Sequence, residues 1–151
     1  MILSEIVGTP SLLEFLRQNP LAVQASVTPS GAPQAAVVAF AVTAQFELIF
    51  DTLESTRKAH NLHADPRIAL VIGGCAPGAL QTLQLEGLAD FPTGAELERL
   101  QQAYFAAFPD GTARLSWPGI TYIRVRPTWA RLSNYANTPP SIVEFSAQEF
   151  K

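Results

Sequence analysis

The chain has 151 residues, of which 48% are hydrophobic and 15% charged, with a formal net charge of -3 and a pI near 5.3. This acidic balance, without a cluster of Lys and Arg among aromatic residues, argues against nucleic acid as a partner. One cysteine, Cys75, and two histidines exclude an intrachain disulfide and a structural zinc site made of soft ligands.

The length and the low charge limit the number of domains and the oligomeric state that the chain can have. The chain fits one domain, residues 1–151, that is large enough to bury a core without disulfides. A surface with few charges leaves apolar area uncovered in a monomer, so we expect a homodimer. The N-terminus lacks a basic segment followed by an apolar one, and no apolar run reaches the roughly 18 residues of a membrane span. These patterns predict a cytoplasmic protein with no membrane contact.

The first 28 residues predict a helix followed by a strand. Thr9-Pro10 is typical of a helix start, and apolar residues recur at helical spacing until Asn19-Pro20 ends the pattern. The following segment, Leu21 to Thr28, alternates between two sets, which predicts a half-buried strand. One set is apolar (Leu21, Val23, Ala25, Val27) and the other largely polar (Ala22, Gln24, Ser26, Thr28).

The next segments predict a hairpin that leads into a second helix. Residues 35–42 are apolar on both faces, which indicates a strand covered on both sides. Phe46 to Phe50 continues in β-branched and aromatic residues after a short break at residues 43–45. The eight residues from Ser55 to Leu62 then predict a helix that ends before Asp65-Pro66.

Two further strands frame a loop. Ile68 to Ile72 predicts a buried strand, and the residues from 73 to 78 form a connection rich in glycine and proline. This connection is not a P-loop, because the helix-opening Gly-Lys-Ser/Thr is missing. Leu80 to Phe91 alternates again, so one face is wet or faces a ligand, and Gly87 indicates a bulge.

The last third of the chain predicts a helix and two strands. A helix begins at Pro92-Thr93-Gly94 and runs through Phe108, with a core-facing stripe of Leu97, Leu100, Tyr104 and Phe108. Residues 120–126 and 128–133 predict two final strands on either side of Pro127, followed by an irregular tail and an amphipathic end over residues 142–150. Six or seven mostly antiparallel strands with three irregularly placed helices predict a mainly β, α+β fold, a small closed barrel rather than a doubly wound sheet.

The segment from Ser55 to Leu62 has the features of a phosphate cradle. Ser55 or Thr56 can cap the helix at the end of a strand, where unpaired backbone N–H groups and the helix dipole favour an anion. Arg57 and Lys58 add positive charge in the first turn, where cations are unfavourable for the helix itself, so the pair indicates a negative group beside it. A capped surface helix with two solvated cations explains the local pattern equally well.

Taken together, these segments resemble the FMN-binding split-barrel family typified by pyridoxamine 5'-phosphate oxidase. The resemblance is carried by Phe46–Thr52, Ser55–Leu62 and Asp65–Val71, matches in order and spacing from Leu21 to Phe91, and continues more loosely in Tyr122–Pro127, Trp129 and Arg131. It implies a six- to seven-stranded antiparallel split barrel in a homodimer, with FMN in a groove between the two subunits.

The resemblance also implies which residues hold the cofactor. The FMN phosphate would be held by Arg57 and Lys58. The other implied positions are Asp51, Thr52, Ser55 and Thr56 on the phosphate and ribityl side, the segment Ala36 to Ala41, including Val37 and Val38, along the isoalloxazine ring, and Thr82 near its polar edge. The neighbouring subunit would contribute Trp129 and Arg131.

Two departures from the family pattern bear on the substrate. The oxidases proper have an Arg and a Lys at the two ends of the strand that faces the flavin, where this chain has Ala36 and Ala41. The oxidase signature near the C-terminus is replaced by residues 127–132, Pro-Thr-Trp-Ala-Arg-Leu, and no histidine follows His63. A second phosphate therefore lacks its expected ligands, and we expect no useful oxidation of pyridoxamine phosphate.

We expect an FMN-dependent oxidoreductase related to pyridoxamine 5'-phosphate oxidase, because a bound flavin supplies the redox chemistry itself. The alternative is a non-catalytic protein on the same barrel that holds flavin, the deazaflavin F420 or haem for sensing or storage. The sequence identifies neither catalytic residues nor a substrate. His60 and His63 share a helix face, but without a third ligand solvated or interface histidines are favoured, and we expect no metal.

Overall fold

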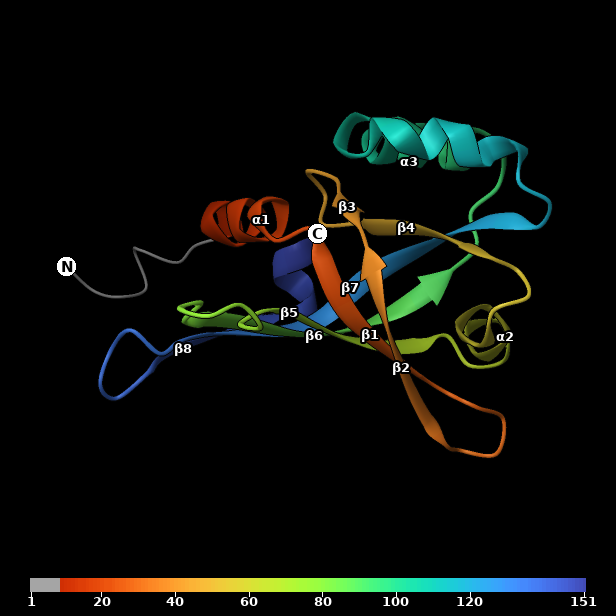
Figure 1. Cartoon of the computed structure of the whole chain (residues 1–151). Helices are drawn as coiled ribbons and strands as arrows, with labels where there is room; N and C mark the ends of the chain where they lie inside the picture. The colour runs from red at the N-terminus through yellow and green to blue at the C-terminus, as the bar shows by residue number, and fades with distance from the viewer. Residues whose placement is uncertain (1–8) are drawn as a thin grey trace.

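The computed structural model describes residues 9–151, and its backbone forms one antiparallel sheet with helices around it (Figure 1). Within these residues the strands are β1 (Leu21–Val27), β2 (Pro33–Ala39), β3 (Ala41–Val42), β4 (Leu48–Leu53), β5 (Arg67–Gly73), β6 (Gln81–Asp90), β7 (Ile120–Asn134) and β8 (Ser141–Ser146). The α-helices are α1 (Thr9–Gln18), α2 (Arg57–Ala64) and α3 (Gly94–Ala107), and the 3-10 helices are η2 (Pro109–Ser116) and η3 (Ala147–Phe150). The expectation that the N-terminus has no basic segment followed by an apolar one concerns mostly residues 1–8, which lie outside the described residues.

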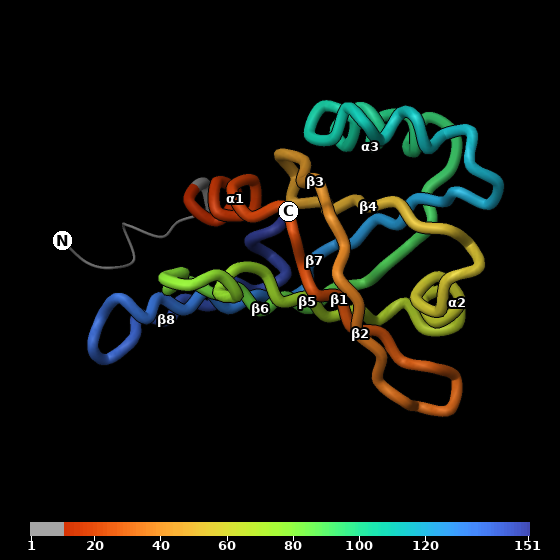
Figure 2. Tube along the Cα trace, viewed as in Figure 1, coloured from red at the N-terminus to blue at the C-terminus, as the bar shows by residue number. Residues whose placement is uncertain are grey.

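Seven strands follow one hydrogen-bonded path in the order β2-β1-β5-β6-β7-β4-β3, and β8 pairs with β7 outside this path. The path ends on β2 and β3, which are consecutive in the chain and separated only by Phe40. Because a single residue joins β2 to β3, the two ends of the sheet lie close together, and the backbone N–H of Phe40 extends the β1–β2 ladder by donating to the Pro20 carbonyl at 2.9 Å. The sheet thus curls into a split barrel rather than the closed barrel that the element count suggested (Figure 2). The α+β class and the antiparallel pairing are confirmed.

The core lies inside the curl of the sheet. Buried side chains from each of the described strands meet there with Leu12, Phe15 and Leu16 of α1. A second, smaller cluster lies between α3 and the outer side of β3, β4 and β7; its buried members are Ala41, Ile49, Leu100, Tyr104 and Tyr122. Figure 1 shows α3 lying over β4 and α2 at a different end of the barrel. The apolar stripe predicted for the α3 sequence is confirmed by its packing in this second cluster.

Strand β1 is half-buried, as predicted, but its polar side chains are the ones inside. Gln24 and Ser26 are 1% and 4% exposed, whereas Leu21 and Val23 are 59% and 37% exposed. The reason is tertiary: α2 closes the inner side, where Asn61 supplies a polar partner for Ser26 at 3.1 Å. The apolar set therefore lies on the outer surface of the sheet.

One prediction for the C-terminal third is wrong, and one strand was not predicted. Residues 120–134 form one continuous strand, β7, instead of two strands separated by Pro127. The irregular tail is confirmed over residues 135–140, but the amphipathic end after it begins with a strand, β8, that pairs with the second half of β7. The bulge predicted at Gly87 is confirmed by a register shift between Glu86 and Gly87, opposite Pro127. Within residues 9–151, no helix has the length and apolarity needed to cross a membrane.

Candidate functional site

Helix α2 begins directly after β4, and Thr56 is its N-cap. The Thr56 hydroxyl oxygen accepts a hydrogen bond from the Ala59 backbone N–H at 3.4 Å, while its own proton is donated to the Leu53 carbonyl at 2.8 Å. Thr52, at the end of β4, lies 3.1 Å away, hydroxyl to hydroxyl. Of the two caps that the sequence allowed, Thr56 is the one used, and Ser55 is exposed. The cap fixes the start of the helix against the strand, so the free N–H groups of its first turn have a defined direction.

Arg57 and Lys58 occupy that first turn without a carboxylate partner. Six of the chain's ten Lys and Arg residues pair with carboxylates: Arg67, Arg99, Arg114, Arg124, Arg126 and Arg131. Among the described residues, neither Arg57 nor Lys58 has a carboxylate within ion-pair distance, and no acidic residue lies in the first turn of α2. Partial burial lowers the pKa of Lys58. An ordinary surface helix would place such charges at its C-terminal end, so this end of α2 is suited to an anion.

The Arg57 side chain reaches the edge strand β2 and meets Gln34. With the Gln34 amide oxygen facing the guanidinium, that oxygen accepts a hydrogen bond from Arg57 Nε at 2.7 Å and a second one from Nη2. The other end of the Gln34 amide lies 2.8 Å from the side-chain amide of Asn61, which in turn lies 3.1 Å from Ser26 Oγ. Ser26, Asn61, Gln34 and Arg57 are thus connected by side-chain hydrogen bonds, and we call this series the polar line. It runs from the inner face of β1 to the start of α2. The sequence analysis missed Gln34 and Asn61, because their partners are far away in the chain.

The residues expected along a flavin ring lie on β2 and β3. Side chains of β2 alternate, so Ala36 and Val38 face the inside of the curl and Val37 faces outward with 66% of its surface exposed. Ala41 is buried beneath α3. Because β2 is at the end of the strand path, its second edge is free of strand partners. Ala36 lies two residues from Gln34 and therefore on the same face of β2.

Asp51 does not join the cradle. It lies on the opposite face of β4 from Thr52 and receives a hydrogen bond from Arg114 Nε at 2.7 Å. Arg114 also donates to the hydroxyl of Tyr104 at 3.1 Å, and burial raises the pKa of Tyr104 to about 12. Asp51 therefore anchors η2 to the barrel beside α3 in this chain.

Thr82, Trp129 and Arg131 lie on the outer face of the sheet. Trp129 is opposite Glu86, Arg131 is opposite Gln84, and Arg131 binds Glu144 at 2.6 Å with its guanidinium 5.5 Å from the centre of the Trp129 ring. Four strand spacings, roughly 19 Å, separate β7 from β2 along the sheet. Trp129 and Arg131 lie in the second part of β7, beyond the part that pairs with β4, the strand that leads into α2. Their role at a neighbouring copy's site stays a prediction.

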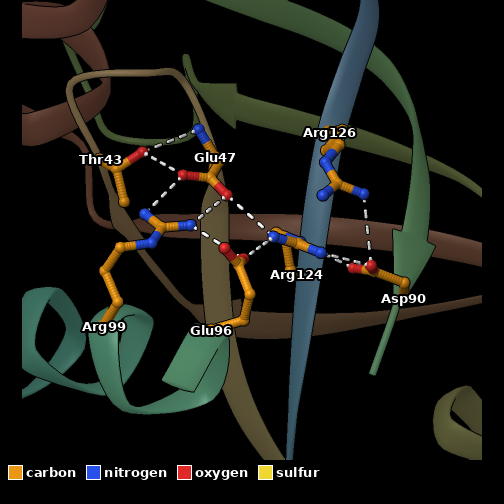
Figure 3. Close-up of polar contacts among 7 residues, drawn as sticks. All are labelled: Thr43, Glu47, Asp90, Glu96, Arg99, Arg124 and Arg126. Carbon is orange, nitrogen blue, oxygen red and sulfur yellow. Dashed lines mark hydrogen bonds and ion pairs between the residues drawn. The ribbon is translucent and has the colours of Figure 1, made fainter. Parts of the chain in front are cut away.

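An ion-pair network centred on the buried Arg124, which sequence reasoning did not identify, joins α3, β6 and β7 (Figure 3). Arg124 of β7, 5% exposed, donates to Glu47, Asp90 and Glu96 at 2.6 to 3.0 Å. Arg99 of α3 makes a two-bond contact with Glu47, with both distances 2.9 Å. The network ties α3 to the β3–β4 turn and to the end of β6. All of its charges are matched, so we assign it a structural role.

The histidines do not form a metal site. The ring of His63 stacks on Phe91 with 3.6 Å between ring centroids, and His60 is exposed. Within the part of the chain that the structure describes, no three His, Cys, Asp or Glu side chains gather so as to hold a metal ion.

The fold is an antiparallel split barrel with a capped and cationic helix after its fourth strand. The sequence model of the pyridoxamine 5'-phosphate oxidase family matches residues 9–137, and the chain belongs to this family. No curated protein sequence matches the chain.

Several solved structures share the fold. A haem-binding protein from Mycobacterium smegmatis has a TM-score of 0.78 at 20% identity, over 95% of this chain and 61% of that one, so the chain spans less than two thirds of its length. A pyridoxamine 5'-phosphate oxidase-related, FMN-binding protein from Nostoc punctiforme has a TM-score of 0.70 at 16% identity, over 91% of this chain and 88% of that one. The haem storage protein HutZ from Vibrio cholerae has a TM-score of 0.64 at 16% identity, over 78% and 88% of the two chains. At these identities the likeness establishes the fold alone.

Proposed function

We propose that the protein binds FMN, with the phosphate held at the start of α2 by Arg57 and Lys58. The observation that carries this proposal is that both cations stand in the first turn of a capped helix without a carboxylate, while six arginines elsewhere are paired. A phosphate dianion would remove the repulsion between these cations and the helix dipole. Thr52 and Thr56 would lie beside the phosphate, and the free edge of β2 near Ala36 would meet the ring. Among the solved structures of this fold, the Nostoc protein is described as FMN-binding.

The site is completed, in this proposal, by a second copy of the chain. Val37, Val23 and Val71 are neighbours across β2, β1 and β5, and all three are exposed on the outer face. The same face carries a groove of about 570 Å³ over β1, β5 and β6, lined in part by Ala25, Ala69 and Leu88. Burying this face against a partner would cover the apolar surface and bring Trp129 and Arg131 of one copy toward α2 of the other. A cytoplasmic location suits the exposed, unpaired thiol of Cys75.

The bound flavin would supply hydride and electron transfer, and the residues of the chain would bind it, orient it and restrict water. On this basis we propose an oxidoreductase. Pyridoxamine phosphate would not be its substrate, because Ala36 and Ala41 supply no cation and Arg124, Arg126 and Arg131 are already paired with carboxylates. Aerobic incubation of FMN-loaded protein with pyridoxine 5'-phosphate should therefore produce no pyridoxal 5'-phosphate; turnover near one per second, an ordinary enzymatic rate, would refute this.

Two measurements test the cofactor and its phosphate site. The visible spectrum of the purified protein should show flavin bands; a Soret band would favour haem and a single band near the violet edge would favour F420. Arg57→Ala should weaken FMN roughly ten- to a hundredfold, because charge-assisted hydrogen bonds are lost, and leave the weaker binding of riboflavin unchanged.

The matched control is Arg17→Ala, which removes an exposed arginine on α1 that also has no ion-pair partner among the described residues. This variant should bind both ligands like the parent. Equal weakening of FMN and riboflavin by Arg57→Ala would show that Arg57 is structural and would remove the basis of the proposal.

A further inference from the structure

The contact between Arg57 and Gln34 has a defined polarity. Arginine only donates, so the Gln34 atom that faces Arg57 Nε at 2.7 Å is the amide oxygen. The Gln34 nitrogen then faces Asn61 at 2.8 Å, and Asn61 must present its oxygen there. The same Asn61 atom is 3.1 Å from Ser26 Oγ, so Ser26 donates its hydroxyl proton to it. Donors and acceptors match along the whole line only in this direction.

The line is anchored in the interior. Ser26 and Asn61 are 4% and 3% exposed, whereas Gln34 is half-buried and Arg57 is exposed. A side chain held between two hydrogen-bonding neighbours has little freedom to rotate. Gln34 is held by Asn61 on its inner side, so its amide oxygen offers the Arg57 guanidinium an acceptor in a fixed place.

We infer that Gln34 is a positioning residue for the phosphate site, a role that rests on the proposed function. Its oxygen takes the Nε–H and one Nη2–H of Arg57, which leaves three of the five guanidinium N–H groups for a phosphate. Because an amide is neutral, it fixes the guanidinium without neutralising it. The paired arginines of this chain, such as Arg99 and Arg124, show the contrasting arrangement, in which carboxylates hold the guanidinium and cancel its charge.

Two substitutions of Gln34 distinguish the positioning of the Arg57 guanidinium from the neutralisation of its charge. Gln34→Met keeps the length of the side chain and removes the acceptor, so Arg57 becomes mobile and the dissociation constant for FMN should rise about three- to tenfold, the loss of one ordinary hydrogen-bond contribution. Gln34→Glu keeps an oxygen at the same place and adds a negative charge, so FMN should weaken at least tenfold, because the carboxylate competes with the phosphate for Arg57. Riboflavin, which lacks the phosphate, should bind both variants like the parent.

Controls come from an exposed glutamine on α3, Gln102, changed to Met and to Glu; both variants should bind FMN like the parent. A second readout needs no cofactor: the Nε–H resonance of Arg57 in ¹⁵N NMR should exchange slowly in the parent and rapidly in Gln34→Met. If the parent binds FMN and both Gln34 variants bind it equally well, the inference fails and the proposed function stands. If the parent binds no FMN, the proposed function fails, and slow exchange that is lost in Gln34→Met still establishes the positioning contact. Rapid exchange in the parent overturns the contact itself.

Discussion

At the scale of single residues, the arginines of this protein fall into two groups. Arg99, Arg114 and Arg124 are held by carboxylates and join α3 and η2 to the barrel. Arg57 is held by a neutral amide and keeps its charge available. The distinction matters because removing one partner of a buried pair leaves the other charge uncompensated, whereas removing an anion-binding arginine affects the ligand more than the fold.

The first prediction concerns Glu47, which accepts hydrogen bonds from Arg99 and Arg124 (Figure 3). Glu47→Gln should lower the free energy of unfolding at pH 7 by about 3 kcal/mol, because Arg124 loses a charged partner in a buried position. For a chain of this length the melting temperature should fall by roughly 6–12 °C. Calorimetry measures both quantities. The control is Glu144→Gln, which breaks an exposed pair with Arg131 and should change the melting temperature little.

The same residue predicts a pH dependence. The hydrogen bond from Arg99 is the largest cause that lowers the pKa of Glu47 below its ordinary value of 4.5, against the opposing effect of burial. The unfolded chain therefore binds more protons than the folded one in this range. The contribution of Glu47 is present above pH 4.5 and is lost as the pH falls through the lower, folded value. The melting temperatures of parent and Glu47→Gln should converge on acidification; a constant difference down to pH 3 would contradict the assignment.

At the scale of elements, β7 explains why the sequence-based prediction divided one strand into two and did not include β8. Its first part, residues 120–125, pairs with β4, and its second part, residues 129–134, pairs with β8. Proline lacks an N–H, and Pro127 lies opposite Gly87 at the bulge, where the ladder is interrupted anyway. The strand therefore passes through the proline without breaking. β8 forms because the second part of β7 would otherwise expose an unpaired edge.

Gly87→Ala tests how tightly β6 and β7 approach at this bulge. An added Cβ would lie 2.7 Å from the Arg126 carbonyl oxygen and 2.8 Å from Val125 Cγ1, so the backbone must shift. We expect a loss of about 2–3 kcal/mol in urea unfolding. Gly78→Ala is the control, because its φ is +78° but its Cβ would meet open space, and its cost should be about 1 kcal/mol. Equal losses in the two variants would show that the bulge tolerates a side chain.

At the scale of the whole molecule, the outer face of β2, β1 and β5 exposes apolar side chains that a single chain leaves uncovered. The apolar set of β1 is exposed beside Val37 and Val71, and the polar set is inside. Exposed apolar patches of this kind mark interaction surfaces. A partner of the same sequence fits the proposed site, since the outer face also carries Trp129 and Arg131.

Val37→Asp tests the proposed homodimer. The parent should scatter light at micromolar concentration as a particle of about twice 16.3 kDa, and the variant as a monomer, because a carboxylate buried in an apolar interface has no partner. Leu115→Asp is the control: Leu115 is 48% exposed on η2, which packs beside α3 and not over β2, β1 and β5, and its substitution should leave the mass unchanged. A monomeric parent that binds FMN stoichiometrically would refute the shared site.

The sequence by itself determined the features that depend on neighbours in the chain. These are most of the strands and helices in their order, a helix capped by Ser55 or Thr56 with Arg57 and Lys58 in its first turn, the bulge at Gly87 and the packing stripe of α3. Caps, turns and periodic patterns act over a few residues, so a single sequence carries them in readable form.

Only the tertiary structure decided which face of each strand is covered and which polar groups meet. Alternation shows that β1 has two different faces, but α2 decides that Gln24 and Ser26 lie inside. Asn61 meets Gln34 across 27 residues of chain and Ser26 across 35, and Asp51 turns away from Thr52 toward Arg114. Such contacts depend on how the sheet curls and where the helices dock, because strand pairing brings together residues that share no local signal.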